Sequence, residues 1–204
     1  MQEKLTENPK YAQILPLIKK IDALLLAGSV IIAIDGNSAS GKTTLANFLA
    51  SLYDCNLYRI DDYFLPLEMR TAERLNEIGG NFDRERFLEE VLLPTKNGLS
   101  LKAKRYDCKS NAFLSPVEYT PKKLTIIEGC YSLHPALAPY YNLSVFMSID
   151  GKTQRERIIK RNSPTLANRF FNEWIPMENA YFEHYDLKNN CSIHLDGATL
   201  DLRK

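Results

Sequence analysis

A glycine-rich segment at residues 36–44 carries the most specific chemistry in this sequence. Within its letters, GNSASGKTT, the residues Gly36, Gly41, Lys42 and Thr43 satisfy the pattern G-x-x-x-x-G-K-[ST]. Glycines allow a backbone to wrap a phosphate with its N–H groups turned inward, and a following helix adds its dipole. In such a loop the lysine reaches the β- and γ-phosphates and the hydroxyl binds Mg²⁺. The nucleotide-binding residues predicted from the segment are Gly36, Asn37, Ser38, Ala39, Ser40, Gly41, Lys42, Thr43 and Thr44.

Acidic residues follow two further stretches that are typical of strands. Asp61 and Asp62 come after residues 57–60, and Glu128 ends the run LTIIE. Ligands of open α/β sheets bind outside the carboxyl ends of the strands, so these acids are expected beside the glycine-rich segment. Because adjacent residues of a strand point to opposite sides, one aspartate of the doublet faces the site. A carboxylate there would accept the proton of a hydroxyl that attacks a γ-phosphate; a solvated Asp-Asp loop is the alternative.

The elements that must position these residues alternate between strands and helices. Residues 30–35, VIIAID, form a continuous apolar run, which is typical of a strand buried on both faces of a parallel sheet. Further strands are predicted at residues 57–60, 124–128, 143–149 and 191–195. Apolar spacing predicts helices at residues 11–26, 45–53, 84–93, 152–162 and 165–185, with a stop at Pro94 and a break at Pro176. The alternation predicts an α/β fold with a mostly parallel sheet, and residues 97–119 suggest a small hairpin outside it.

Composition limits the classes of partner. The chain has 204 residues, a length that predicts one domain, and 26 basic against 25 acidic residues give a net charge of +1. A near-neutral chain offers no extended field that would gather nucleic acid. The longest apolar run, residues 23–34, is too short to span a membrane, and the start of the chain lacks the apolar core of a signal peptide. Four cysteines without a CxxC pair favour reduced thiols, so we expect a cytoplasmic protein.

Six segments, taken in order, resemble one branch of the P-loop kinases. GNSASGKTT, IDDYF, NFD, RYD, IIEG and RERIIKRN are similar to the uridine kinase and phosphoribulokinase branch, which also includes nicotinamide riboside and pantothenate kinases. The resemblance covers residues 30–195. It implies a P-loop NTPase fold of three α/β/α layers, and the chain length predicts one domain spanning residues 1–204. The helix before Gly28 lies outside the resemblance, which leaves its role open. Within that domain we expect a helical extension at residues 1–28, an acceptor-side insertion at about 97–119 and a helical lid at about 152–170.

The resemblance also assigns roles on the phosphate side of the site. It makes Asp61 the catalytic base, close enough to Mg²⁺ to order its waters, and gives Glu128 to the metal together with Thr43. Lys42 is expected to neutralise charge during transfer of the phosphate. Arg157, Arg161 and Arg169 fall in the lid segment, where guanidinium groups clamp the transferred phosphate; a basic helix face exposed to solvent is the alternative.

Four residues are assigned to the acceptor by the same resemblance. Asp83 of NFD matches an acid that holds ribose hydroxyls, and Tyr106 of RYD matches a tyrosine of the nucleobase pocket. Phe64 and Arg169 are the other expected substrate contacts. The sequence departs from uridine kinases at Asn111, where they carry a histidine that reads the pyrimidine.

The sequence therefore supports several functions to different degrees. We expect a kinase that uses ATP and Mg²⁺ to phosphorylate a hydroxyl of a nucleoside or a similar small metabolite, as uridine and cytidine kinases do. The alternatives are a kinase for a pantothenate- or sugar-like acceptor, and a regulatory nucleotide-binding protein with little or no kinase activity. A GTPase is disfavoured because the sequence has no guanine-reading NKxD. A homo-oligomer is compatible with the sequence, and neither nucleic acid nor a membrane is expected as a partner.

Overall fold

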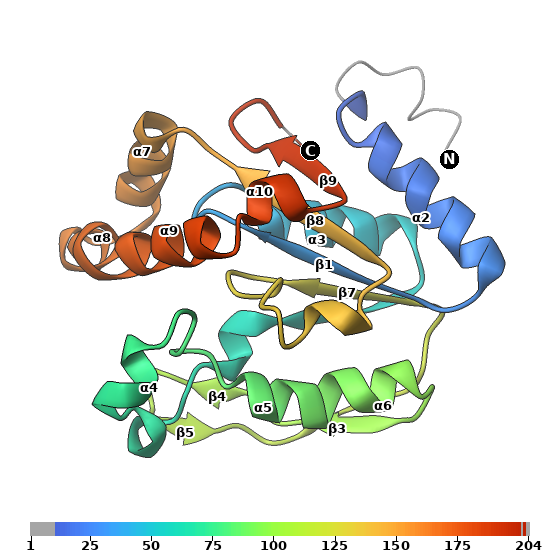
Figure 1. Cartoon of the computed structure of the whole chain (residues 1–204), viewed down its shortest axis with the longest axis horizontal. Coiled ribbons are helices and arrows are strands. Elements are labelled where there is room, and N and C mark those ends of the chain that lie inside the picture. The colour runs from blue at the N-terminus through green and yellow to red at the C-terminus, as the bar shows by residue number, and fades with distance from the viewer. Residues whose placement is uncertain (1–10, 201, 203–204) are drawn as a thin grey trace.

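A five-stranded sheet forms the centre of the molecule (Figure 1). The computed structural model describes residues 11–200 and 202. The strand order is β2-β7-β1-β8-β9, and every pairing is parallel. The strands are β1 (Val30–Gly36), β2 (Cys55–Arg59), β7 (Leu124–Glu128), β8 (Leu143–Ser148) and β9 (Ile193–Asp196). The predicted α/β fold with a mostly parallel sheet is thus confirmed.

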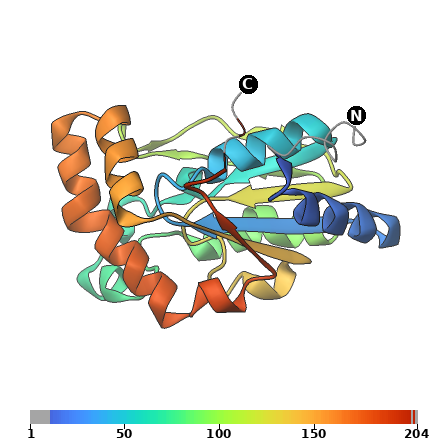
Figure 2. The ribbon, with the colours of Figure 1, turned by 90° about the horizontal axis from the view of Figure 1, so that it is seen from above.

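Helices cover both faces of this sheet and complete three layers. The longer ones are α2 (Leu15–Ala27), α3 (Lys42–Leu52), α7 (Gly151–Arg161) and α9 (Ile175–His184). The shorter ones are α4 (Ala72–Asn76), α5 (Arg84–Phe87), α6 (Leu93–Lys96), α8 (Pro164–Arg169) and α10 (Leu187–Asn190). In two perpendicular views α7, α8 and α9 lie beyond the carboxyl end of β1, and α2 lies toward its start (Figures 1 and 2).

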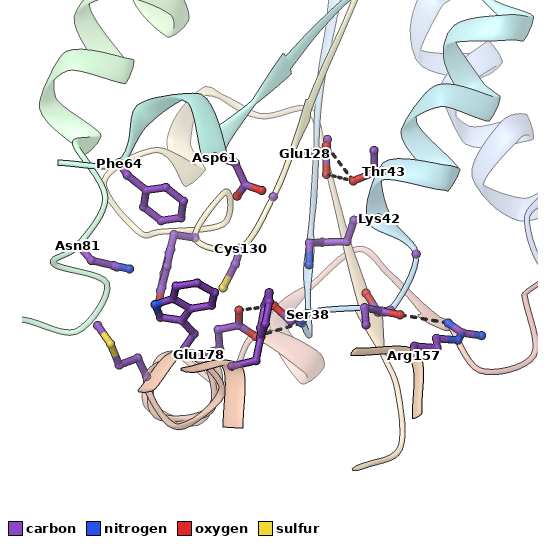
Figure 3. A pocket seen from close by; sticks show the side chains of 18 of the residues that line it. Ser38, Lys42, Thr43, Asp61, Phe64, Asn81, Glu128, Cys130, Arg157 and Glu178 are labelled. Carbon is purple, nitrogen blue, oxygen red and sulfur yellow. Dashed lines mark hydrogen bonds between the residues drawn. The ribbon is translucent and has the colours of Figure 1, made fainter. Parts of the chain in front are cut away.

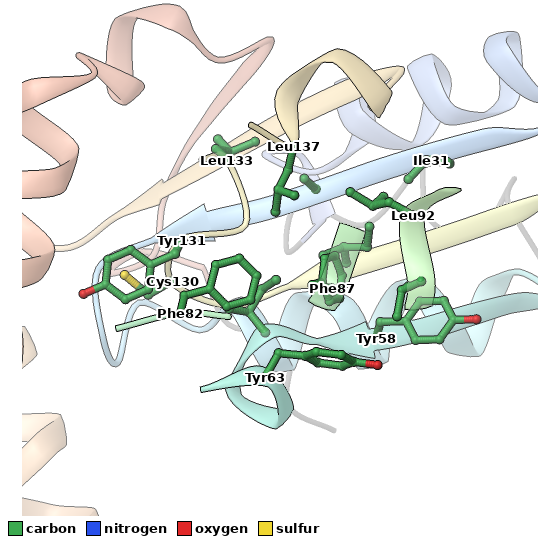
Figure 4. Close-up of a cluster of buried hydrophobic side chains, with 14 of the residues drawn as sticks. Ile31, Tyr58, Tyr63, Phe82, Phe87, Leu92, Cys130, Tyr131, Leu133 and Leu137 are labelled. Carbon is green, nitrogen blue, oxygen red and sulfur yellow. The ribbon is translucent and has the colours of Figure 1, made fainter. Parts of the chain in front are cut away.

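Alternation along β1 divides the core into two clusters. Successive side chains of a strand point to opposite faces, so Ile32 and Ile34 pack on one side, and Ile31 and Ala33 on the other. The first side contacts α2 and α3. The second side holds a group of aromatic residues, including Tyr58, Tyr63, Phe82, Phe87 and Tyr131 (Figure 4).

The helix before β1 is part of the core. The sequence predicted it, but the resemblance left its role open. Its side chains Ile14, Leu17, Ile18 and Ile21 are buried against the sheet and α3. Burial of each such side chain stabilises the fold by about 1.5–3 kcal/mol. Of the expected extension at residues 1–28, the first ten lie outside the described residues.

Two prolines that were predicted to stop helices do not do so. Pro94 and Pro176 each follow a π-helical turn, at Leu88–Leu92 and Phe170–Trp174, and the helix continues beyond both. A proline lacks an N–H, and its ring clashes with the carbonyl four residues earlier. A π-turn shifts the hydrogen-bond register and so relieves both problems. The predicted stop and break were therefore wrong.

The segment between α6 and β7 forms two small antiparallel ladders instead of one hairpin. β3 (Leu101–Ala103) pairs with β6 (Val117–Tyr119), and inside this pair β4 (Tyr106–Asp107) meets β5 (Ala112–Phe113). Asn111 lies in the inner turn with φ 51°. Over the described part of the chain, no helix is both long and apolar enough to cross a membrane.

Candidate active site

A cavity of about 860 Å³ opens at the carboxyl ends of β1, β2 and β7 (Figure 3). Its lining comes from the glycine-rich loop, the turn after β2, the end of β7 and the helices α7–α9. This is the edge at which open parallel sheets bind ligands. The cavity therefore collects residues that are far apart in the sequence.

The glycine-rich loop is held tightly against the sheet. Gly36 has φ 136°, and a Cβ there would lie 2.0 Å from the carbonyl oxygen of Met147. Lys42 Nζ donates hydrogen bonds to the carbonyls of Gly36 (2.7 Å) and Asn37 (3.0 Å), which fixes the ammonium beside the loop. No side chain caps α3, so its first N–H groups are available to an anion.

A hydroxyl and a carboxylate meet next to this loop. Thr43 Oγ1 lies 3.1 and 3.2 Å from the two carboxylate oxygens of Glu128, which is only 4% exposed. Burial raises the pKa of Glu128, while the charge of Lys42 opposes this shift. Among the described residues, no three His, Cys, Asp or Glu side chains form a metal site by themselves. This oxygen pair fits Mg²⁺, which takes one or two protein oxygens and completes its octahedron with phosphates and water.

The two aspartates after β2 differ in environment. Both lie in the 3₁₀ turn Ile60–Tyr63. Asp61 is exposed and lines the cavity, whereas Asp62 is half-buried and does not. Burial raises the pKa of Asp62, and the charge of Arg105 opposes the shift. Only Asp61 therefore shares the cavity with Lys42 and Glu128 (Figure 3).

The three predicted arginines all line the cavity, but their partners differ. Arg157 donates to the carbonyls of Ala39 (3.1 Å) and Gly197 (2.9 Å), so it joins the loop to the segment after β9. Arg161 lies over the ring of Phe170, at 5.3 Å. Arg169 pairs with Glu173 at 3.1 Å. Backbone carbonyls thus hold Arg157, an aromatic ring contacts Arg161 and an acid pairs with Arg169.

Two of the predicted acceptor residues are not in the cavity lining. Asp83 is 2% exposed, accepts a hydrogen bond from the backbone of Arg86 and pairs with its Nε at 2.8 Å. Tyr106 is buried against Phe113, with their ring centroids 5.3 Å apart. Phe64 does line the cavity. The structure thus brings Phe64 to the site but not Asp83 or Tyr106.

Two acids in this region were not predicted. Asp35, fully buried, accepts hydrogen bonds from Gly36 N (2.6 Å), Leu133 N (2.9 Å) and Tyr181 Oη (2.9 Å), and burial raises its pKa to about 6. Glu178 accepts two hydrogen bonds from Ser38 of the loop. An acid at the end of an apolar strand was a readable signal for Asp35. Glu178 falls within the helix predicted at residues 165–185, to which no site residue beyond Arg169 was assigned.

Comparison of the sequence and of the fold with known proteins finds proteins named or described as uridine kinases. No family model matches the chain. The protein named uridine kinase-like protein 5 of Arabidopsis thaliana is 31% identical over 146 residues, which are 65% of this chain and 30% of that protein. The uridine kinase of Staphylococcus haemolyticus is 24% identical over 175 residues, which are 78% of this chain and 84% of that enzyme. A solved structure described as a possible uridine kinase from Bacillus stearothermophilus has a TM-score of 0.64 at 21% identity, covering 89% of this chain and 100% of its own.

The chain is similar in sequence to proteins named uridine kinase and uridine kinase-like, and it has the P-loop kinase fold. The resemblance seen in its motifs is thereby confirmed. A candidate fructose transport system kinase from Silicibacter has a similar fold, with a TM-score of 0.65 at 19% identity, covering 82% of this chain and 89% of its own. The chain spans about 30% of the length of its Arabidopsis relative.

Proposed function

We propose that the protein is a kinase that transfers the γ-phosphate of ATP, with Mg²⁺, to a hydroxyl of a small metabolite. The observation that carries the proposal is a single cavity shared by the loop lysine Lys42, the Thr43–Glu128 oxygen pair and the exposed carboxylate of Asp61. A phosphate cradle, a metal-binding pair and a base are the parts that phosphoryl transfer to an alcohol requires.

Each of these residues has a distinct task in the proposed reaction. Bound ATP and Mg²⁺ supply the phosphoryl group and a cation that balances its charge. Asp61 accepts the proton of the acceptor hydroxyl, and Lys42 balances negative charge on the β- and γ-phosphates. Thr43 and Glu128 hold the metal. Arg161 and Arg169 stabilise charge on the transferred group and help to exclude water.

The acceptor has two candidates. A nucleoside is supported by the names of the two sequence relatives, both of which include uridine kinase. A pantothenate- or sugar-like acceptor is supported by the positions at which the resemblance predicted nucleoside contacts. Asp83 is occupied by Arg86, Tyr106 is packed against Phe113, and Asn111 replaces the pyrimidine-reading histidine.

Arg70 also supports the second candidate, the pantothenate- or sugar-like acceptor. It lines the cavity, and its Nε donates to the carbonyl of Leu65 at 2.8 Å. Arg74, Arg84 and Arg86 all form ion pairs with acids, whereas Arg70 has no acidic partner within the described residues. A guanidinium that lines a cavity and has no ion pair with an acid suits an acceptor that carries a carboxylate or a phosphate.

An ADP-release assay tests the proposal and separates the acceptors. The panel contains uridine, cytidine, ribose, pantothenate and the neutral analogue pantothenol, each with Mg²⁺ and ATP, and ATP alone is the control. Stimulation by uridine or cytidine supports the nucleoside, and stimulation by pantothenate but not pantothenol supports an anionic acceptor. If no acceptor raises ADP release while ATP still binds, the regulatory alternative replaces the kinase.

A further inference from the structure

The carboxylate of Glu178 lies inside the phosphate-binding loop. Its Oε2 accepts a hydrogen bond from the backbone N–H of Ser38 at 3.0 Å, and its Oε1 accepts one from the Ser38 hydroxyl at 2.5 Å. Glu178 belongs to α9, 140 residues further along the chain, and is 5% exposed. Figure 3 shows both contacts at the edge of the cavity. None of the roles proposed above uses this side chain.

The position of Ser38 in the loop indicates which phosphate would compete with Glu178 for its donors. Ser38 is the third residue of the motif, at the end of the loop away from the start of α3. The N-terminus of α3 suits the β-phosphate and Lys42 reaches the β- and γ-phosphates, so we expect the Ser38 donors, at the far end of the loop, to face the γ-phosphate. A carboxylate presents two acceptor oxygens with negative charge, as a phosphate does. Glu178 thus occupies donors that a γ-phosphate needs and that a diphosphate needs less.

The negative charge of Glu178 opposes a second anion at the same place. Burial raises the pKa of Glu178, and the nearby negative charge of Asp61 adds to this rise. The positive charge of Lys42 opposes it and favours the charged form of Glu178. Glu178 in turn favours the charged form of Arg161. A γ-phosphate that reached Ser38 would meet the carboxylate at close range, where like charges in a partly buried site repel strongly. The carboxylate and the γ-phosphate therefore exclude one another.

A second contact shows how displacement of Glu178 would affect the rest of the helix. One turn further along α9, Tyr181 donates a hydrogen bond to the buried Asp35 at 2.9 Å. The helix is thus fastened to the end of β1 by Tyr181 and to the loop by Glu178. Before Glu178 the helix runs back to Trp174, which ends a π-helical turn, and through that turn to Arg169 at the end of α8; both residues line the cavity. The Tyr181 contact does not involve Ser38, so it can remain when Glu178 leaves Ser38.

We propose that Glu178 makes the loop discriminate between nucleoside triphosphates and diphosphates. The carboxylate occupies the Ser38 donors until a γ-phosphate displaces it. This displacement shifts the helical segment before α9, in which Arg169 ends α8 and Trp174 ends the π-helical turn, over the cavity. Glu178 therefore acts as a positioning residue that links the γ-phosphate to the acceptor side, and this role does not depend on which acceptor is phosphorylated.

The single tryptophan of the chain reports this movement directly. Trp174 contacts Phe170 edge to face, with ring centroids 4.6 Å apart, and the guanidinium of Arg169 lies 4.8 Å from the Trp174 ring centroid. Its fluorescence is followed while wild type, Glu178→Gln and Glu183→Gln are titrated with Mg²⁺ and either ADP or a non-hydrolysable ATP analogue. Glu183→Gln is the matched control, because Glu183 is exposed on the same helix.

The expected results concern binding alone. In wild type the triphosphate changes Trp174 fluorescence and ADP does not. Glu178→Gln, which keeps the shape but loses the charge, binds the triphosphate about tenfold more tightly and leaves ADP affinity unchanged. Glu183→Gln behaves as wild type. The inference is overturned if Glu178→Gln binds the triphosphate no more tightly than wild type, or if ADP and the triphosphate change the fluorescence equally. Because no phosphoryl transfer is measured, failure of the kinase proposal leaves this test intact.

Discussion

His134 makes the stability of the folded chain sensitive to mild acid. Its ring is parallel to the ring of Tyr181, with centroids 6.4 Å apart, and meets Tyr185 edge to face at 5.7 Å. Nδ1 accepts the N–H of Ala136 at 3.2 Å, a contact that requires this nitrogen to be unprotonated. His134 is 7% exposed, and burial followed by the charge of Arg84 lowers its pKa from 6.5 to about 4. The folded state therefore binds this proton less readily than the unfolded chain.

The sign and size of the effect follow from this shift. Since the folded pKa lies below the unfolded one, the contribution is complete above pH 6.5 and is lost as the pH falls toward 4. At 1.36 kcal/mol per pKa unit the full loss is about 3 kcal/mol, of which about 2 kcal/mol has gone at pH 5. Asp35 titrates nearby with the opposite sign, because burial raises its pKa and protonation favours the folded state. A variant that changes only His134 isolates the contribution of His134 to the change in the free energy of unfolding with pH.

Urea unfolding of wild type and His134→Gln near pH 7.5 and pH 5 measures this share. Glutamine cannot gain the proton, so the free energy of unfolding of the variant should fall by about 2 kcal/mol less than that of wild type over this interval. His184→Gln, at an exposed position on α9, should retain the wild-type dependence on pH. An equal fall in wild type and His134→Gln would refute the assignment.

Two further substitutions test the glycine-rich loop and the buried Asp83–Arg86 pair. Gly36→Ala should abolish ATP binding in calorimetry, because the new Cβ would lie 2.0 Å from a carbonyl oxygen, whereas Gly151→Ala has open space around it and should bind normally. Wild-type affinity in Gly36→Ala would contradict the described loop. Arg86→Gln leaves the buried Asp83 without its cation and should lower the free energy of unfolding by about 3–5 kcal/mol, measured by urea denaturation. A loss below about 1 kcal/mol would show that Asp83 is not held by this pair.

Strong local patterns made part of the fold predictable. β7 has the predicted bounds, because its apolar run has no competing helical spacing and packs between two strands. The errors at Pro94 and Pro176 have a physical cause. A proline forbids an α-helical hydrogen bond but not a π-turn, and whether the chain can form one depends on packing of the surrounding helix.

The site was predictable only where its signal is local. The glycine-rich loop is one continuous segment, so its pattern alone identified Lys42 and Thr43. The pairing of Asp83 could have been predicted from the sequence, since an arginine three residues later can pair with an acid at the start of a helix. The contact of Glu178 could not be predicted in this way, because its partner Ser38 is 140 residues away and only the fold brings the two residues together.

The most direct test of the central claim compares Asp61→Asn with wild type. ADP release is measured with saturating ATP, Mg²⁺ and the best acceptor of the panel, and ATP affinity is measured separately by calorimetry. The proposed base predicts a turnover lower by about 10²-fold or more, with ATP affinity changed by less than about twofold. Unchanged turnover in Asp61→Asn would remove Asp61 from this role, and a wild type that no acceptor stimulates would contradict the kinase itself.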